Sequence, residues 1–170
     1  MNYLNRGPGD NVGNFYTDTI EKDPRFNSLK PVNDLAMLEP VLRKLVRQII
    51  SDAADDGTKL MVFETYRSQA RQSRLYAQGA TQLKTVGVHH YGLACDLVKD
   101  ISGSPSWKGD FKFLGKLAKK YDLVWGGDWG KPRVKTRFPD NVHIQRCAVS
   151  DQRKLFAGTW YPDADYDPYH

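Results

Sequence analysis

The sequence predicts an α+β fold in one compact domain. The chain has 170 residues, which is close to the usual size of a single domain. Hydrophobic residues make up 40% and charged residues 26%, so there is enough apolar material for a core and no sign of global disorder. Segments with helical periodicity alternate with short apolar runs typical of strands, and the chain contains no internal repeat.

Composition divides the chain into three parts. Residues 1–30 are rich in Gly, Asn, Asp and Pro with scattered aromatic residues, which predicts an irregular N-terminal arm that drapes over the body of the protein. Residues 31–150 carry the periodic segments and form the predicted domain body. Residues 151–170 are predicted to be a C-terminal tail that packs on this body.

Two helices and a strand are predicted in the first half of the body. The first helix begins at Pro40, which suits a first helical turn, and ends near Gly57. Its apolar positions share one face: Val41, Leu42, Leu45, Val46, Ile49, Ile50 and Ala53. A short apolar run at 60–63 predicts a strand, and Ser68 is placed to cap a second helix that runs to about Gly79.

The second half predicts a strand, a helix and two more strands. A loop leads into residues 89–98, whose second half has the composition of a buried strand. After another loop, Asp110 is placed to cap a helix that turns Phe111, Leu114, Leu117 and Ala118 inward. Strands are predicted at 123–125 and 142–145, with a sharp turn between them at the sequence Trp-Gly-Gly-Asp-Trp, residues 125–129.

The net charge indicates the kind of surroundings in which the protein acts, but it does not identify a partner. Lys and Arg number 25 against 20 Asp and Glu, which gives a net charge of +5 and favours a polyanionic environment such as nucleic acid or an acidic cell wall. No recognised nucleic-acid-binding motif is present, so we expect no nucleic-acid partner. The N-terminus lacks the apolar stretch of about 7 to 15 residues found in signal peptides. We therefore expect synthesis in the cytoplasm without a signal peptide, and no stable membrane association.

Three of the four histidines lie beside carboxylates in two short motifs, and the first is His89-x-x-Gly92-x-Ala94-x-Asp96. If the chain is extended from Gly92, residues 92, 94 and 96 share one face. The two small residues would then leave space in front of the Asp96 carboxylate. A histidine and a carboxylate that converge on such a space suit a divalent metal, with zinc–ligand distances of about 2.0 to 2.2 Å.

The second motif is Asp140-x-x-His143-x-Gln145. His143 can supply a second imidazole, and Asp140 can stand next to the metal without binding it. Three protein ligands leave the fourth tetrahedral position for water, which is typical of a catalytic zinc site. Zinc lowers the pKa of such a water to about 7, and a nearby carboxylate can carry its proton to a leaving amine. These residues therefore predict hydrolysis.

The remaining histidine of the first pair and the two cysteines are expected outside the ligand set. His90 does not fit the spacing, so we expect it to be exposed or hydrogen-bonded beside the site. A continuing strand would put Cys147 on the face of His143 and Cys95 on the opposite face. Because a disulfide would have to pass through the sheet, we predict two free thiols.

The two motifs, in this order, resemble the M15 family of zinc peptidases, which includes D-Ala-D-Ala dipeptidases and carboxypeptidases and phage L-alanyl-D-glutamate endopeptidases. The sequence Tyr-Arg-Ser at 66–68, with Leu75-Tyr76 and Gln78-Gly79, resembles the arginine motif of the endolysin subgroup. The segment 125–129 resembles the region before that subgroup's last ligand. The resemblance covers residues 35 to 150 and implies a small antiparallel sheet flanked by helices, as in D-Ala-D-Ala peptidases and the Hedgehog signalling domain.

The resemblance also implies a role for each site residue. His89, Asp96 and His143 would be the zinc ligands, and Asp140 would be the general base and then the general acid. Arg67 would steady the scissile carbonyl, because a guanidinium is permanently charged and can hydrogen-bond a developing oxyanion. The alternative for Arg67 is a cap or ion pair at a helix start.

Two further residues are candidates for substrate binding, Asp128 and Gln145, although Asp128 could equally hold its turn by hydrogen bonds. The basic segment with Lys131, Arg133, Lys135 and Arg137 is either a solvated face or a contact for an acidic wall polymer. The sequence departs from the family at Gly87, where a serine is usual. The aspartate at position 140 is the catalytic acid found in the endolysin subgroup, whereas the dipeptidases have a glutamate in that role.

These observations predict a zinc-dependent peptidoglycan peptidase of the endolysin type that hydrolyses the L-Ala–D-Glu bond of the murein stem peptide. It would be a monomer with zinc as its cofactor and the stem peptide as its partner, acting on the wall after release through a holin-like pore. One alternative is a D-Ala-D-Ala carboxypeptidase on the same scaffold. Another is a non-catalytic zinc-containing binding module, which would have no use for Asp140 and Arg67.

Overall fold

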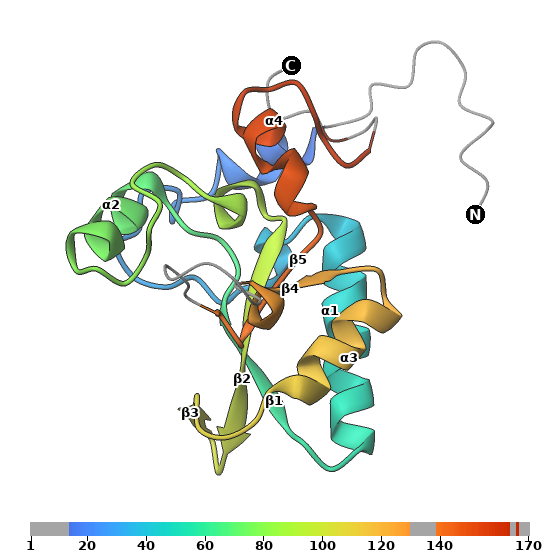
Figure 1. Ribbon diagram of the computed structural model, residues 1–170. Coiled ribbons are helices and arrows are strands. Elements are labelled where there is room, and N and C mark those ends of the chain that lie inside the picture. The colour runs from blue at the N-terminus through green and yellow to red at the C-terminus, as the bar shows by residue number, and fades with distance from the viewer. Residues whose placement is uncertain (1–13, 130–138, 164–165, 167–170) are drawn as a thin grey trace, which may run out of the picture.

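An antiparallel sheet forms the centre of the computed structural model, which describes residues 14–129, 139–163 and 166. The strands follow the order β1–β2–β5–β4, and β3 pairs with β2 off this path (Figure 1). Their bounds are β1 Leu60–Glu64, β2 Ala94–Ile101, β3 Ser104–Ser106, β4 Val124–Trp125 and β5 His143–Gln145. The predicted α+β class is confirmed, with a small antiparallel sheet flanked by helices.

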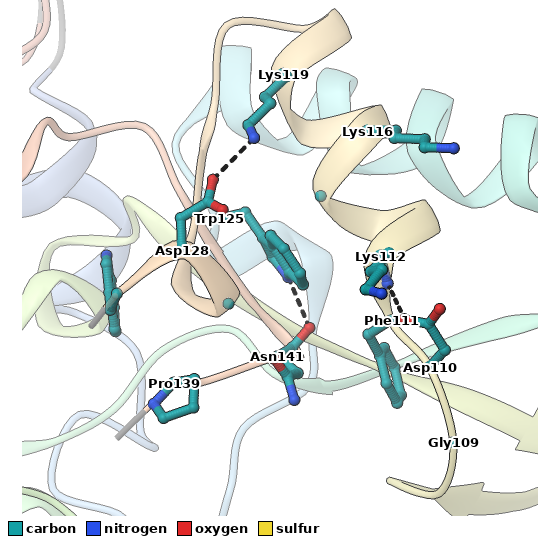
Figure 2. Close-up of a pocket in the computed structure, with 13 residues that line it drawn as sticks. Gly109, Asp110, Phe111, Lys112, Lys116, Lys119, Trp125, Asp128, Pro139 and Asn141 are labelled. Carbon is teal, nitrogen blue, oxygen red and sulfur yellow. Dashed lines mark hydrogen bonds and ion pairs between the residues drawn. The ribbon is translucent and has the colours of Figure 1, made fainter. Parts of the chain in front are cut away.

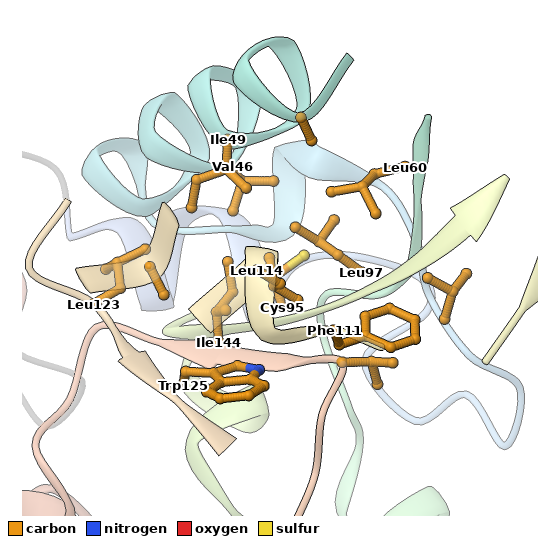
Figure 3. Packing of buried hydrophobic residues seen from close by; sticks show 14 of the residues in the cluster. Val46, Ile49, Leu60, Cys95, Leu97, Phe111, Leu114, Leu123, Trp125 and Ile144 are labelled. Atoms are coloured by element: carbon orange, nitrogen blue, oxygen red, sulfur yellow. The ribbon is translucent and has the colours of Figure 1, made fainter. Parts of the chain in front are cut away.

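Two helices, α1 (Pro40–Asp55) and α3 (Lys112–Lys120), cover one face of this sheet (Figure 1). Side chains alternate along a strand, so Cys95 and Leu97 of β2 point toward these helices together with Ile144 of β5 (Figure 3). The core that they form is fully buried and includes Leu42, Val46, Ile49, Leu114 and Ala118 from the two helices. The next residues along β2 and β5 therefore face the other side.

The helix starts agree with the sequence. The Glu39 carboxylate accepts hydrogen bonds from the backbone amides of Val41 and Leu42 at 2.7 and 3.0 Å, directly before Pro40. The Ser68 hydroxyl accepts from the Arg71 amide at 3.0 Å and begins α2 (Gln69–Ala77), which lies across the sheet from α1 and α3 (Figure 1). Asp110 likewise accepts from the Lys112 amide at 2.7 Å, although Phe111 occupies the N-cap position of α3.

The described part of the N-terminal arm, residues 14–30, packs on the body and contains a helical turn. The turn is π-helical, Tyr16–Ile20, and a 3-10 turn, Leu35–Met37, follows it at the start of the body. Their side chains enter a second buried cluster with Tyr66, Leu93 and Ala94. The arm therefore supplies part of the interior behind the other face of the sheet.

The expectation for Gly92 was wrong in its physical reason. Gly92 ends the 3-10 turn Val88–Tyr91 with φ +66°, so the strand begins only at Ala94. A Cβ at this position would lie 2.7 Å from the Met37 carbonyl oxygen and 3.0 Å from the Ile20 side chain. The missing side chain thus admits the N-terminal arm and does not open a space for a metal.

The C-terminal segment carries a short helix that the sequence did not reveal, α4 (Gln152–Phe156), after the 3-10 turn Val149–Asp151. Leu155 is fully buried, and the hydroxyl of Tyr166 donates a hydrogen bond to the Tyr91 carbonyl. Arg146 forms an ion pair with Asp163 at 2.7 Å. These contacts hold the described part of this segment against the body.

The two cysteines are free, as predicted, and both are buried, in different apolar clusters. Burial raises the pKa of Cys147 to about 12. No helix in the described part of the chain is long and apolar enough to cross a membrane.

Candidate metal centre

Two neighbouring strands and the turn before one of them bring three candidate ligands together. Asp96 on β2 lies directly opposite His143 on β5, on the face away from α1 and α3. His89 joins them from the 3-10 turn Val88–Tyr91, which precedes β2. All three side chains are buried, with residue exposures of 3% for His89 and 5% for each of the others.

The three ligand atoms form a nearly equilateral triangle. His89 Nε2 is 3.2 Å from Asp96 Oδ1 and 3.2 Å from His143 Nδ1, and His143 Nδ1 is 3.1 Å from the same carboxylate oxygen. A tetrahedral zinc site with ligands at about 2.0 to 2.1 Å has ligand–ligand distances of about 3.3 Å. The triangle therefore has the size of one face of such a tetrahedron.

The outer hydrogen bonds fix which nitrogen of each imidazole carries the proton. His89 Nδ1 lies 2.9 Å from the Thr65 carbonyl oxygen, which can only accept, so Nδ1 donates. His143 Nε2 lies 2.9 Å from Gln145 Oε1 and donates to it. In the neutral rings, His89 Nε2 and His143 Nδ1 are then left as bare acceptors, both directed at the Asp96 carboxylate.

Three acceptors this close repel one another unless a positive charge lies among them. Burial alone would lower the pKa of His143, but the negative charge of Asp96 raises it and so favours a positive charge on that ring. A divalent cation would serve all three at once. The donor set of two imidazole nitrogens and one carboxylate oxygen thus fits zinc, and the three residues form a group that could hold a metal ion.

Asp140 lies next to this triangle in the turn before β5. Its backbone amide donates to the Gly126 carbonyl at 3.0 Å, and its own carbonyl accepts from the His143 amide at 3.2 Å. A Cβ on Gly126 would lie 2.5 Å from the Asp140 carbonyl oxygen and 3.1 Å from His143 Cβ, so a glycine is needed for this close approach. The turn Gly126–Asp128 is thereby pressed against the segment that carries Asp140.

The Asp140 carboxylate is free to exchange a proton. Among the residues that the structure describes, it has no hydrogen-bond partner. Burial and then the negative charge of Asp96 raise its pKa above the ordinary value of an aspartate. A carboxylate with a raised pKa suits a group that must both accept a proton and give it back.

Arg67 reaches the centre from the segment between β1 and α2. Its Nη2 lies 3.4 Å from Asp96 Oδ2, the oxygen that the triangle does not use. The ion pair that we considered as an alternative also exists, since Nη2 is 2.6 Å and Nε 3.1 Å from Glu64 Oε2. This partner holds the guanidinium beside the candidate ligands, so the two interpretations are compatible.

Glu64 is a site residue that the sequence analysis missed. A register shift between Val62 and Glu64 places it opposite Asp96, so Glu64, Asp96 and His143 form a row across three strands. Burial alone would raise the pKa of Glu64, but Arg67 and Arg71 together hold it below its ordinary value. The sequence signal was a glutamate at the end of an apolar strand, three residues before an arginine.

His90 points away from the ligand triangle and supports Arg67 from behind. Its Nδ1 lies 3.2 Å from the Arg67 carbonyl oxygen, and its Nε2 lies 2.7 Å from the Tyr16 hydroxyl. The ring is surrounded by the aromatic rings of Tyr16, Phe26 and Tyr66. Its place beside the site, hydrogen-bonded and outside the triangle, is the one expected.

Of the two candidate substrate-binding residues, Gln145 is placed otherwise than expected. It is 1% exposed, and its amide nitrogen donates to the Cys147 carbonyl and to Gln152 Oε1, which turns its oxygen toward His143. We therefore assign it to positioning the His143 ring. The other candidate, Asp128, forms an ion pair with Lys119 at 3.0 Å, and both residues line a cavity. The basic segment 131–137 lies outside the described residues, so its role stays a prediction.

Trp129 lines two cavities, and its ring centroid lies 4.8 Å from that of His143. The larger measures about 530 Å³ and lies between α3 and the segment 125–129 (Figure 2). The smaller measures about 290 Å³ and is lined by Asp140 and by residues 79–83. Trp129 was not singled out in the sequence, where only the turn that contains it drew attention.

Comparison with known proteins gives a consistent result. A model of the M15 peptidases described as D-alanyl-D-alanine carboxypeptidase matches residues 81–146. The peptidoglycan L-alanyl-D-glutamate endopeptidase CwlK of Bacillus subtilis (strain 168) is 28% identical over 138 residues, which cover 70% of this chain and 79% of the relative. The L-alanyl-D-glutamate peptidase of Listeria phage A118 is 31% identical over 124 residues, which cover 69% of this chain but only 40% of the phage protein.

Solved structures share the fold. The L-Ala D-Glu endopeptidase ChiX of Serratia marcescens superposes with a TM-score of 0.53 at 25% identity, covering 71% of this chain and 87% of that one. The D,D-pentapeptidase VanY superposes with a TM-score of 0.51 at 15% identity, covering 71% of this chain and 78% of that one. The second likeness concerns the fold alone.

Proposed function

From the similarity to M15 peptidases and to two L-alanyl-D-glutamate peptidases, we propose that the chain is a zinc-dependent peptidoglycan endopeptidase that hydrolyses the L-Ala–D-Glu bond of the stem peptide. The observation that carries this proposal is the triangle of buried acceptors next to an uncommitted carboxylate, Asp140. The choice of bond is supported by relatives from Bacillus subtilis and Listeria phage A118 that are named for this activity.

His89, Asp96 and His143 would hold the zinc ion through the three atoms of the triangle. When bound there, zinc would supply a Lewis acid that lowers the pKa of a water molecule to about 7. Thr65 and Gln145 keep the two imidazoles in the tautomers and orientations that metal binding requires. The outer partners are therefore part of the proposed site.

Asp140 would take a proton from the attacking water at its carboxylate and pass it to the amine of the leaving glutamate. Arg67 would donate a hydrogen bond to the oxygen of the scissile carbonyl as negative charge builds on it. Glu64 keeps that guanidinium in place through the two hydrogen bonds to its Oε2. The chain thus offers a proton carrier and a fixed positive charge next to the proposed metal.

A D-Ala-D-Ala carboxypeptidase is the second candidate, and the description of the matching family model favours it. A non-catalytic zinc-containing module is disfavoured by the free carboxylate of Asp140, which such a module would not need. We further propose that the chain acts as a monomer on the cell wall after release from the cytoplasm, without a nucleic-acid partner or stable membrane association.

Digestion of purified murein tests these alternatives. An L-Ala–D-Glu endopeptidase releases peptides with a new N-terminal glutamate, whereas a carboxypeptidase releases free D-alanine, and mass spectrometry distinguishes the two. Activity should be lost with a chelator and restored by zinc. Persistent cleavage by the chelated protein would contradict the proposed cofactor, and release of D-alanine alone would favour the second candidate.

A further inference from the structure

We propose that Arg71 is a positioning residue that acts on the reaction through Arg67. The two guanidinium groups share the carboxylate of Glu64, which balances one of their positive charges and leaves the other available where Arg67 would meet the scissile carbonyl. This inference rests on the proposed function, because it concerns the charge that stabilises the oxygen of that carbonyl.

The carboxylate of Glu64 joins the two arginines directly. Its Oε2 accepts from Arg67 Nη2 at 2.6 Å and Nε at 3.1 Å, and also from Arg71 Nη2 at 3.4 Å. Its Oε1 accepts a second hydrogen bond from Arg71, donated by Nε. Because donors from both residues share one oxygen atom, the guanidinium groups of Arg67 and Arg71 are neighbours.

The same contacts continue into the ligand triangle. Arg67 Nη2 lies 3.4 Å from Asp96 Oδ2, so direct contacts lead from Arg71 through Glu64 and Arg67 to a proposed zinc ligand. These side chains are sheltered from water, with exposures of 1% for Glu64, 13% for Arg71 and 16% for Arg67. Charges in such a place are screened much less than charges on the surface.

Arg67 is surrounded by negative charge. Burial alone would lower its pKa, but the charges of Glu64, Asp96 and Asp140 raise it. Asp96 would share its charge with the proposed metal, and Asp140 would exchange a proton during the reaction. Glu64 is then the carboxylate that opposes Arg67 at every stage. A neutral pair of Glu64 and Arg67 alone would stabilise a developing oxyanion less than a net positive group.

Arg71 supplies the charge that this pair lacks. Two guanidinium groups and one carboxylate leave one positive charge in excess, and arginine keeps its proton at any working pH. The attraction between this charge and a negative oxygen beside Arg67 extends beyond direct contact, because the surroundings are buried. Arg71 can therefore favour the transition state without touching the substrate.

The position of Arg71 in its helix runs against the usual preference. Ser68 caps α2 and accepts from the Arg71 amide, which places Arg71 in the first turn. The dipole of a helix disfavours a cation there. Departures from such local preferences concentrate at functional sites. The placement therefore agrees with a use for the charge of Arg71 near the centre.

A double-mutant cycle separates the charge of Arg71 from its structural contacts. Arg71→Met removes the charge and keeps an unbranched side chain, whereas Arg71→Lys keeps the charge. The double variant Glu64→Gln/Arg71→Met removes one charge of each sign. Arg74→Met is the matched control, because Arg74 lies on α2 as well, is exposed, and lines neither of the two cavities described above. Each zinc-loaded protein is assayed for kcat and KM on a synthetic stem peptide, and its Tm is measured.

We expect kcat of Arg71→Met to fall about 10- to 30-fold with KM little changed, as for one unit charge removed from roughly 8 to 12 Å away at an effective dielectric constant of about 20. Arg71→Lys should recover most of this loss, and Arg74→Met should behave as wild type. The double variant should be more active than Arg71→Met, because the charge of Arg67 is then no longer opposed by Glu64.

The double variant decides the question even if Arg71→Met does not fold, because it leaves no buried carboxylate short of a partner. A double variant as inactive as Arg71→Met, or folded but far below wild type, would assign Arg71 to structure or to substrate contact and overturn the proposal. An unchanged kcat of Arg71→Met would do the same. These results leave the proposed function intact, whereas failure of the wild-type protein to cleave the peptide would overturn both.

Discussion

Replacing Gln145 with leucine should weaken zinc binding without touching a ligand. The Gln145 amide oxygen accepts the hydrogen bond from His143 Nε2 at 2.9 Å, in a position that is 1% exposed. Leucine has a similar volume, so the change removes an acceptor and leaves little cavity. The imidazole N–H would then lie in the interior without a partner, and the ring would lose the contact that orients Nδ1 toward the metal.

Two lines of reasoning give the same magnitude. Loss of the outer partner of a metal-bound histidine typically costs about 10- to 100-fold in metal affinity, or about 1.4 to 2.7 kcal/mol. An unpaired buried donor costs about 1 to 3 kcal/mol. We therefore expect the zinc Kd of Gln145→Leu to rise about 10- to 100-fold. The variant Gln145→Glu retains an acceptor oxygen and should stay closer to the wild-type value.

Competition with a chromophoric zinc chelator at equilibrium measures this Kd, and circular dichroism of the metal-free proteins reports whether each variant is folded. Gln152→Leu is the matched control, because Gln152 contacts the Gln145 amide nitrogen at 3.1 Å and is not among the hydrogen-bond partners of His143. A folded Gln145→Leu protein that binds zinc as tightly as wild type would refute the positioning role.

Three other changes separate catalysis, support and packing. Asp140→Asn should lower murein hydrolysis by about 10²- to 10⁴-fold with zinc content and Tm near wild type, and loss of zinc from this variant would make Asp140 a ligand. His90→Ala should retain one zinc per chain, measured by elemental analysis. Its Tm should fall, because the change removes a buried ring that is hydrogen-bonded to Tyr16. A zinc-free His90→Ala protein would place His90 in the ligand set. Gly115→Ala should lower the free energy of unfolding in urea by about 1 to 3 kcal/mol, since the new Cβ would lie 2.4 Å from the Trp125 ring; equal or greater stability would contradict the tight packing there.

Local patterns in the sequence were sufficient for the main elements. Helix α1 follows from seven apolar positions on one face, and the starts of α1 and α2 follow from Pro40 and Ser68. The convergence of Asp96 and His143 was also predictable, because the alternation of a strand fixes which residues share a face. Two short elements, β3 and α4, show no period of their own and were missed.

The errors came from contacts between distant parts of the chain. Alternation puts Gln145 on the face of His143, but only the fold shows that it turns inward to the ring instead of outward to a substrate. Gly92 was assigned to the metal site because its real neighbours, Met37 and Ile20, lie more than 50 positions earlier in the chain. Glu64 reaches the site through a register shift, which depends on the pairing of two strands and cannot be deduced from its local signal, a glutamate at the end of an apolar run.

The packing of residues 16–37 determines how short a fragment of this chain can be if it is to remain active when fused to another protein. Thr65, whose carbonyl holds His89, is itself fastened by its hydroxyl to the carbonyls of Val32 and Asp34 at 3.0 and 2.9 Å. Tyr66 donates to the Phe26 carbonyl at 2.7 Å. A fusion cut at the edge of the similarity to M15 peptidases, near residue 35, would discard these anchors, so an engineered lytic module should begin upstream of Tyr16.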